Sequence, residues 1–136
     1  MNGTTATTAA PTSLVIADDS PAGISRARDA ARAFANSLRP APDTTSADTL
    51  ALVVSELATN ALRHGGGRYT LELSADPRAV RVSVSDPNPA HPRERTPDLN
   101  GDTGGFGWHM IRRLVGKVTI TPGPGRGKTI HAVLPC

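Results

Sequence analysis

The sequence predicts an α/β fold, a two-layer α/β sandwich in which helices lie on one face of a mixed, mostly antiparallel sheet. Two observations lead to this prediction. Some segments repeat their apolar residues at spacings of three and four, as amphipathic helices do, and others repeat them at every second position, as strands do. The strand-like segments follow one another in pairs with short turns between them, which is typical of hairpins and not of alternating strand–helix units.

The chain has 136 residues, which is about the size of one domain. We expect residues 1–13 to form a flexible N-terminal tail, because they are small and polar and show no period. Residues 14–136 are expected to form a single domain. Its first strand is predicted in the apolar run 14–17, and a helix follows with Ser20 as its cap and Pro21 in its first turn.

The remaining elements are separated by stretches rich in glycine and proline. The second helix is predicted to end at the glycine run that begins with Gly65. The segment 86–103 has almost no apolar side chains, and a loop this long inside a compact domain usually carries function, so we expect a lid or binding loop. The first helix is expected to extend to residue 38, and the second to occupy residues 46–64. The other expected elements are a helix at 107–114 and strands at 69–73, 80–84, 117–121 and 128–134.

Composition and charge argue against several classes of function. The net charge of +3 is mild and the arginines are scattered among acids, so we expect no nucleic-acid surface. No apolar run approaches the roughly 20 residues of a membrane span, so no membrane contact is expected. Cys136 is the single cysteine and cannot form an internal disulfide, which favours a cytoplasmic location.

Polar residues recur along one side of the second predicted helix. Glu56 and Asn60 are four residues apart, and His64 is four further on, so the three side chains lie along one stripe. A carboxylate there could act as a general base, and an amide oxygen one turn along could complete the ligand shell of Mg²⁺. The plain alternative is that these residues form the solvated side of an amphipathic helix.

Two further features could contact a ligand. Asp86 follows a predicted strand and precedes a proline, so its carboxylate could accept hydrogen bonds from an amino group such as that of adenine, or it could simply begin a turn. Gly104, Gly105 and Gly107 precede a predicted helix, where backbone N–H groups could approach phosphates. These glycines could also serve only to turn the chain.

The order of these motifs resembles that of the GHKL ATPases, the superfamily of gyrase, Hsp90 and histidine-kinase ATPases. The segment 55–65, Ser-Glu-Leu-Ala-Thr-Asn-Ala-Leu-Arg-His-Gly, resembles the N box of the anti-sigma-factor serine/threonine kinases in this superfamily. The segment 84–87 resembles the start of the G1 box, 104–108 the G2 lid box, and 127–129 the G3 region. The resemblance extends from about residue 14 to residue 134 and implies the Bergerat fold.

The resemblance also implies roles for individual residues. Glu56 would be the general base, Asn60 the Mg²⁺ ligand, and Asp86 the acceptor of the adenine amine. The three glycines Gly104, Gly105 and Gly107 would line the phosphates of ATP, and Thr129 would support the adenine end of the pocket beside Asp86. Kinases of this group phosphorylate a serine of an antagonist (anti-anti-sigma) protein and hold a sigma factor, typically as homodimers.

Two departures from the family pattern leave two functions open. Asn88 and Ala90 occupy the glycine positions of the G1 pattern Asp-x-Gly-x-Gly, and the segment 103–108 contains no basic residue to meet the γ-phosphate. The first hypothesis is an ATP- and Mg²⁺-dependent serine/threonine kinase that restrains a sigma factor. The alternative is a nucleotide-binding interaction module without phosphotransfer activity.

Overall fold

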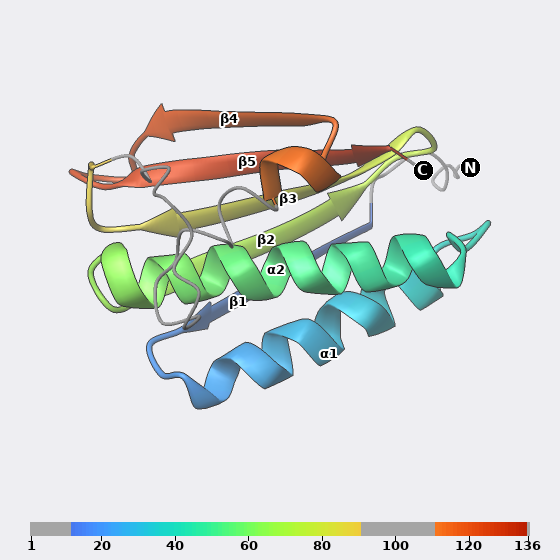
Figure 1. Ribbon diagram of the computed structural model, residues 1–136, viewed down its shortest axis with the longest axis horizontal. Helices are drawn as coiled ribbons and strands as arrows, with labels where there is room; N and C mark the ends of the chain where they lie inside the picture. The colour runs from blue at the N-terminus through green and yellow to red at the C-terminus, as the bar shows by residue number, and fades with distance from the viewer. Residues whose placement is uncertain (1–11, 91–110, 136) are drawn as a thin grey trace, which may run out of the picture.

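A computed structural model of the protein describes residues 12–90 and 111–135. Within this part, a five-stranded sheet and two helices form the predicted two-layer sandwich (Figure 1). The strand order is β1-β2-β3-β5-β4, and each of these neighbouring pairs is antiparallel. The elements are β1 (Thr12–Asp18), α1 (Ala22–Ser37), α2 (Thr44–His64), β2 (Tyr69–Ala75), β3 (Ala79–Asp86), β4 (Lys117–Pro122) and β5 (Lys128–Pro135).

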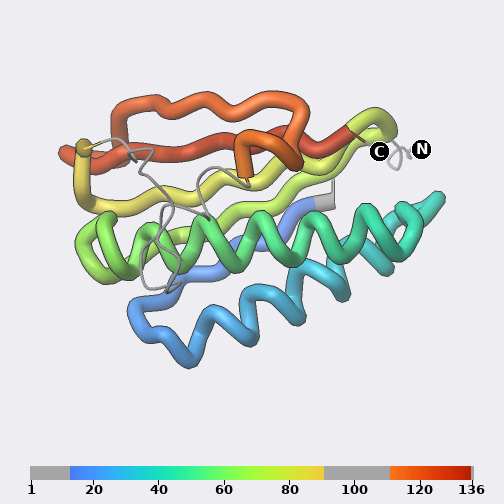
Figure 2. The backbone as a smooth tube through the Cα atoms, in the orientation of Figure 1, coloured from blue at the N-terminus to red at the C-terminus, as the bar shows by residue number. Residues whose placement is uncertain are grey.

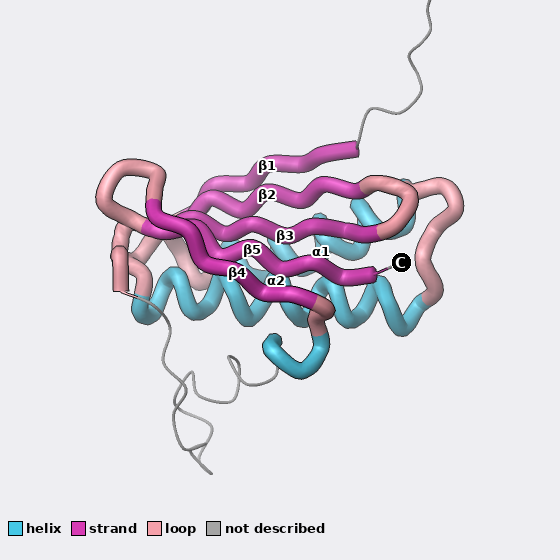
Figure 3. The backbone as a smooth tube through the Cα atoms, turned by 90° about the horizontal axis from the view of Figure 1, so that it is seen from above, coloured by secondary structure: helices cyan, strands magenta, loops and turns pink. Residues whose placement is uncertain are grey.

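Both helices cover the same face of the sheet. They run beside each other along it, with α2 over the centre of the sheet (Figure 2). The helical turn at 111–114 lies on this side too and places Ile111 in the core, whereas no described element covers the other face (Figure 3). Neither helix in the described part has both the length and the apolar character that a membrane crossing requires.

Helix α2 ends where the sequence predicts and begins two residues earlier than predicted, at Thr44. The Asp43 carboxylate accepts a hydrogen bond from the Ser46 backbone N–H at 2.8 Å and so caps the first turn. The predicted apolar stripe is buried between α1 and the sheet, which gives α2 its orientation. The helix ends at Gly65, whose N–H bonds to the Ala61 carbonyl at 2.9 Å.

The start of α1 differs from the prediction. Pro21 occupies the N-cap position, and no side chain caps the helix there. Ser20 makes no capping bond because its hydroxyl and its backbone N–H both lie within 3.1 Å of Asp18 Oδ1. The Asp18 carboxylate therefore organises the turn between β1 and α1, and hydrogen bonds from the backbone N–H groups of Asp19 and Ser20 lower the pKa of Asp18.

The pleat of the sheet decides which side chains of β3 and β5 face the helices. In β3, Val82 and Val84 are buried beneath α2, and Asp86 has the same parity at the end of the strand. The neighbouring strand β5 pairs Lys128 with Asp86 and Ile130 with Val84. The charged residues Asp86 and Lys128 consequently continue two apolar rows of the core to its edge, next to the C-terminal end of α2.

Candidate functional site

Helix α2 places the first two predicted site residues at the boundary of the core. Asn60 is buried, with 9% of its surface exposed, and its carboxamide makes no hydrogen bond within the described chain. Glu56, one turn earlier, is half-buried. Asn60 is therefore not part of a solvated helix face, and a carboxamide that bonds to no described residue is a group that a ligand or an ion can satisfy.

Burial changes the acid strength of Glu56. Desolvation raises the pKa of its carboxyl above the ordinary value of 4.5, and the positive charge of Arg63 opposes this shift in part. No described side chain donates a hydrogen bond to the Glu56 carboxylate. A carboxylate with a raised pKa and no donor is better suited to accept a proton than a solvated one.

Asp86 lies at the end of β3 with its carboxylate against the last turn of α2. A Cβ atom at Gly65 would be 2.5 Å from both Cγ and Oδ2 of Asp86, so only glycine allows this approach. Behind Asp86, a Cβ atom at Gly127 would be 1.9 Å from the Asp86 carbonyl oxygen. Two glycines from distant parts of the chain thus form a cradle around one buried acid, which is 6% exposed.

The two oxygens of the Asp86 carboxylate have different surroundings. Oδ1 accepts hydrogen bonds from the Asn88 backbone N–H and from Lys128 Nζ, each at 2.9 Å. Lys128 Nζ also donates to the Asn88 carbonyl at 2.9 Å. Within the described chain no group donates to Oδ2. One oxygen is thus held by the protein, and the other is left to accept a hydrogen bond.

Lys128 is a member of this cluster that the sequence analysis missed. Its side chain is 5% exposed and that of Asp86 is 2% exposed, so the two form a buried ion pair. The signal was present in the sequence: Lys128 has the parity of the apolar residues Ile130 and Ala132 in the same strand. A lysine at a strand end is usually exposed, so the shared parity with buried residues was not taken as a sign of burial.

Thr129, predicted to support the adenine end beside Asp86, lies next to Lys128 and across from Ser85 in the sheet. Adjacent residues of a strand point to opposite faces, so Thr129 points away from the helices. Its hydroxyl lies 2.8 Å from Ser85 Oγ and donates to the Gly123 carbonyl at 2.8 Å. Lys128 contacts the Asp86 carboxylate directly, and the supporting role of Thr129 at the adenine end stays a prediction.

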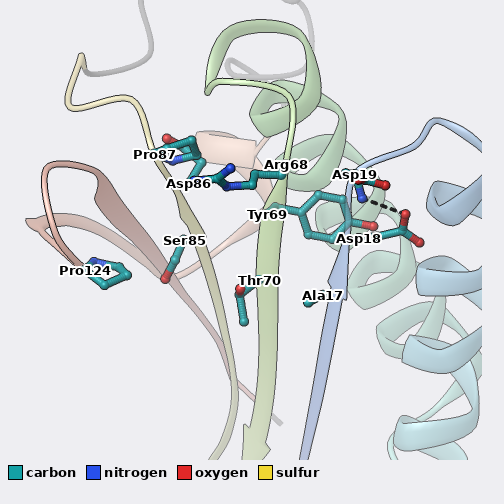
Figure 4. Close-up of a pocket in the computed structure, with 10 residues that line it drawn as sticks. All are labelled: Ala17, Asp18, Asp19, Arg68, Tyr69, Thr70, Ser85, Asp86, Pro87 and Pro124. Carbon is teal, nitrogen blue, oxygen red and sulfur yellow. Dashed lines mark hydrogen bonds between the residues drawn. The ribbon is translucent and has the colours of Figure 1, made fainter.

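A groove lies at the ends of the strands on the side of Asp86 (Figure 4). Its volume is about 540 Å³, and it extends from Asp18 and Tyr69 to Pro124, with Thr70 and Ser85 on its floor. Asp86 lines this groove, but Glu56 and Asn60 do not. The groove is therefore not the predicted pocket between α2 and the lid.

The predicted phosphate-binding glycines Gly104, Gly105 and Gly107 lie outside the described residues, as does most of the segment 86–103. Within the described residues, no three acidic, histidine or cysteine side chains come together to hold a metal ion. A bound Mg²⁺ would therefore rely on an amide oxygen such as that of Asn60, together with oxygens of a ligand and water. The described part of the site thus offers a half-buried carboxylate, a buried amide and a cradled acid, all on the helix-facing side of the sheet.

A comparison with protein-family models matches residues 18–134 to the histidine kinase-like ATPase domain. The chain belongs to this family. Membership in it implies an ATP-binding, regulatory protein, and it agrees with the two-layer fold and with the order of the motifs. No curated protein matches the chain.

The residues around the end of α2 fit the nucleotide that a histidine kinase-like ATPase domain implies. Oδ2 of Asp86, to which no described group donates, can accept a hydrogen bond from an amino group, and the Asn60 carboxamide, which bonds to no described residue, can meet a cation that carries phosphates. Both groups lie on the helix-facing side of the sheet, as one ligand would require. The candidate site residues would therefore come from α2 and from the end of β3, with Lys128 in contact with Asp86.

Proposed function

We propose that this histidine kinase-like ATPase domain is an anti-sigma-type regulator, a Mg²⁺-dependent serine/threonine protein kinase that phosphorylates an antagonist protein and restrains a sigma factor. The observation that carries the proposal is the state of Glu56. It stands one turn before the buried Asn60, accepts no hydrogen bond from a described residue, and has a raised pKa because it is half-buried. A general base needs these properties.

In the proposed reaction, Glu56 takes the proton of a serine hydroxyl on the antagonist while that oxygen forms a bond to the γ-phosphorus of ATP. The bond between the γ-phosphorus and the bridging oxygen breaks, and ADP leaves. Asn60 would hold Mg²⁺, which neutralises charge on the phosphates. Asp86 would accept a hydrogen bond from the amine of adenine through Oδ2 and so orient the nucleotide.

The kinase proposal is tested by phosphate transfer. The protein is incubated with γ-labelled ATP, Mg²⁺ and candidate antagonist proteins, and Glu56→Gln is compared with wild type. Glu72→Gln is the matched control, because Glu72 is an exposed glutamate on β2. Transfer that is lost in Glu56→Gln and kept in Glu72→Gln supports the proposal, whereas equal transfer by both variants contradicts the role of Glu56.

The second candidate is a nucleotide-binding interaction module without phosphotransfer. It is favoured by the segment after Asp86, where Asn88 and Ala90 replace the glycines of the family pattern. The side-chain amide of Asn88 donates a hydrogen bond to the His64 carbonyl at 2.7 Å, which connects this segment to the end of α2. ATP binding that is intact in calorimetry, with no transfer to any antagonist that binds the protein, would favour this module.

A further inference from the structure

The buried ion pair between Lys128 and Asp86 has no role in the function proposed above. A buried ammonium group is costly unless a carboxylate and further acceptors surround it. Lys128 meets this condition with Asp86 Oδ1 and the Asn88 carbonyl, each at 2.9 Å from Nζ. Its two partners, Asp86 and Asn88, both contact the C-terminal end of α2, where the helix dipole favours a positive charge.

The pair fixes the orientation of the Asp86 carboxylate. Oδ1 receives both the ammonium group and the Asn88 N–H, so rotation of the carboxylate would break two hydrogen bonds at once. Oδ2 is then held against the end of α2, 2.5 Å from where a Cβ atom of Gly65 would be. A carboxylate fixed in this way presents one acceptor and no donor.

We infer, on the basis of the proposed ATP site, that Lys128 is the positioning residue that makes the base end of this site selective for a purine with an exocyclic amine. An amine at the 6-position of the purine donates a hydrogen bond to Oδ2. A purine with hydrogen at this position cannot make the hydrogen bond. In a purine with a carbonyl group there, the carbonyl oxygen and Asp86 Oδ2 are both acceptors and repel each other. Lys128 acts through Asp86 and does not itself need to touch the base.

Calorimetry of three proteins with two nucleotides tests the inference. The nucleotides are ADP and the diphosphate of purine riboside, which has hydrogen in place of the 6-amine. Wild type is expected to prefer ADP by about tenfold or more, as a hydrogen bond to a charged acceptor provides. Lys128→Met should lower this ratio to about threefold or less and still bind both nucleotides through their phosphates. Lys117→Met, at the exposed and only other lysine, should keep the wild-type ratio.

If Lys128 has only a structural role, Lys128→Met should weaken the binding of both nucleotides equally. An unchanged ratio of the two affinities in a folded Lys128→Met therefore overturns the inference. Equal binding of the two nucleotides by wild type also overturns it and leaves the ATP site intact. If wild type binds neither nucleotide, the proposed function fails first and the inference falls with it.

A second measurement avoids the variant in case Lys128→Met does not fold. The wild-type protein labelled at lysine gives two side-chain ammonium signals in NMR, from Lys117 and Lys128. The Lys128 ammonium protons are expected to exchange with water much more slowly than those of Lys117, both in the free protein and with ADP bound. Exchange of Lys128 as fast as that of Lys117 in the ADP complex would mean that the pair opens, which overturns the inference.

Discussion

Replacement of Gly65 by alanine should damage the fold and the site together. The backbone of Gly65 has φ −103°, which any residue can adopt, so the expected effect is steric. A Cβ atom there would lie 2.5 Å from Asp86 Cγ and Oδ2, and 2.8 Å from the Ala61 carbonyl oxygen. Real Cβ atoms essentially never approach so closely, so either Asp86 or the end of α2 must move.

Neither of these groups can move at low cost. The Ala61 carbonyl accepts the last hydrogen bonds of α2, and the Asp86 carboxylate is held by Lys128 and by the Asn88 N–H. Overpacking of this kind typically costs about 1–3 kcal/mol. A glycine-to-alanine change also stabilises a protein by about 0.4–1 kcal/mol through the unfolded chain. The free energy of unfolding should therefore fall by roughly 1–2 kcal/mol, which lowers Tm by about 3–10 °C for a domain of this size.

Gly116→Ala is the matched control. The nearest atoms to a Cβ at Gly116 are 3.5 Å away, which is ordinary contact, so this variant should be as stable as wild type or slightly more stable. Thermal unfolding followed by circular dichroism measures both variants, and calorimetry with ADP measures the site. If Gly65→Ala matches Gly116→Ala in Tm and in ADP affinity, the close packing of Asp86 against α2 is refuted.

Three other variants test separate parts of the structure. The phosphate-transfer rate should fall as the pH drops through the raised pKa of Glu56, at a pH above 4.5. The raised pKa also means that the folded state prefers the protonated carboxyl, so wild type should lose stability relative to Glu56→Gln as the pH rises past this point. Denaturant titrations at several pH values measure this difference. Asn60→Leu should keep the free energy of unfolding or raise it by up to about 1 kcal/mol, because it removes a carboxamide that bonds to no described residue. It should also abolish the Mg²⁺ dependence of ATP binding in calorimetry, and a loss of stability with this dependence intact would contradict the assignment. Asp43→Ala should destabilise α2 at pH 7. Because the hydrogen bond from the Ser46 N–H lowers the pKa of Asp43, the difference in Tm between this variant and wild type should disappear as the pH falls below 3.8. A difference in Tm that persists at lower pH would exclude the charged cap.

Most of the fold could be predicted because its signals are local. The apolar stripe of α2 ends at a glycine run, and the hairpin of β2 and β3 turns at Asp76, whose carboxylate accepts the N–H groups of Arg78 and Ala79. The start of α1 was predicted less well, because Ser20 and Asp18 are both good capping residues. The path of the chain out of β1 brings the Ser20 N–H and hydroxyl to the Asp18 carboxylate, which accepts hydrogen bonds from both.

The composition of the site could be predicted only in part, because it depends on the pairing of strands far apart in the sequence. Asp86 and Lys128 are 42 residues apart along the chain, and they meet because β3 and β5 are neighbours in one register. A shift of that register by one residue would bring Thr129 to the helix-facing side instead. The motif order suggested Thr129 as a member of the site, and the register of the sheet adds Lys128 as the residue that contacts Asp86.

The segment after Asp86 shows how the chain can differ from the family pattern and keep the acid in place. Where the pattern has a glycine, Asn88 donates from its side chain to the His64 carbonyl at 2.7 Å and from its backbone to Asp86 at 2.9 Å. Its carbonyl accepts from Lys128, so one residue joins α2, β3 and β5. Glycine at this position would lose the first of these bonds and leave a carbonyl at the end of α2 without this partner. The asparagine and Lys128 therefore form one connected unit around Asp86, and their substitutions should be non-additive in ADP affinity, with the double variant Asn88→Gly/Lys128→Met binding more tightly than the sum of the two single losses predicts.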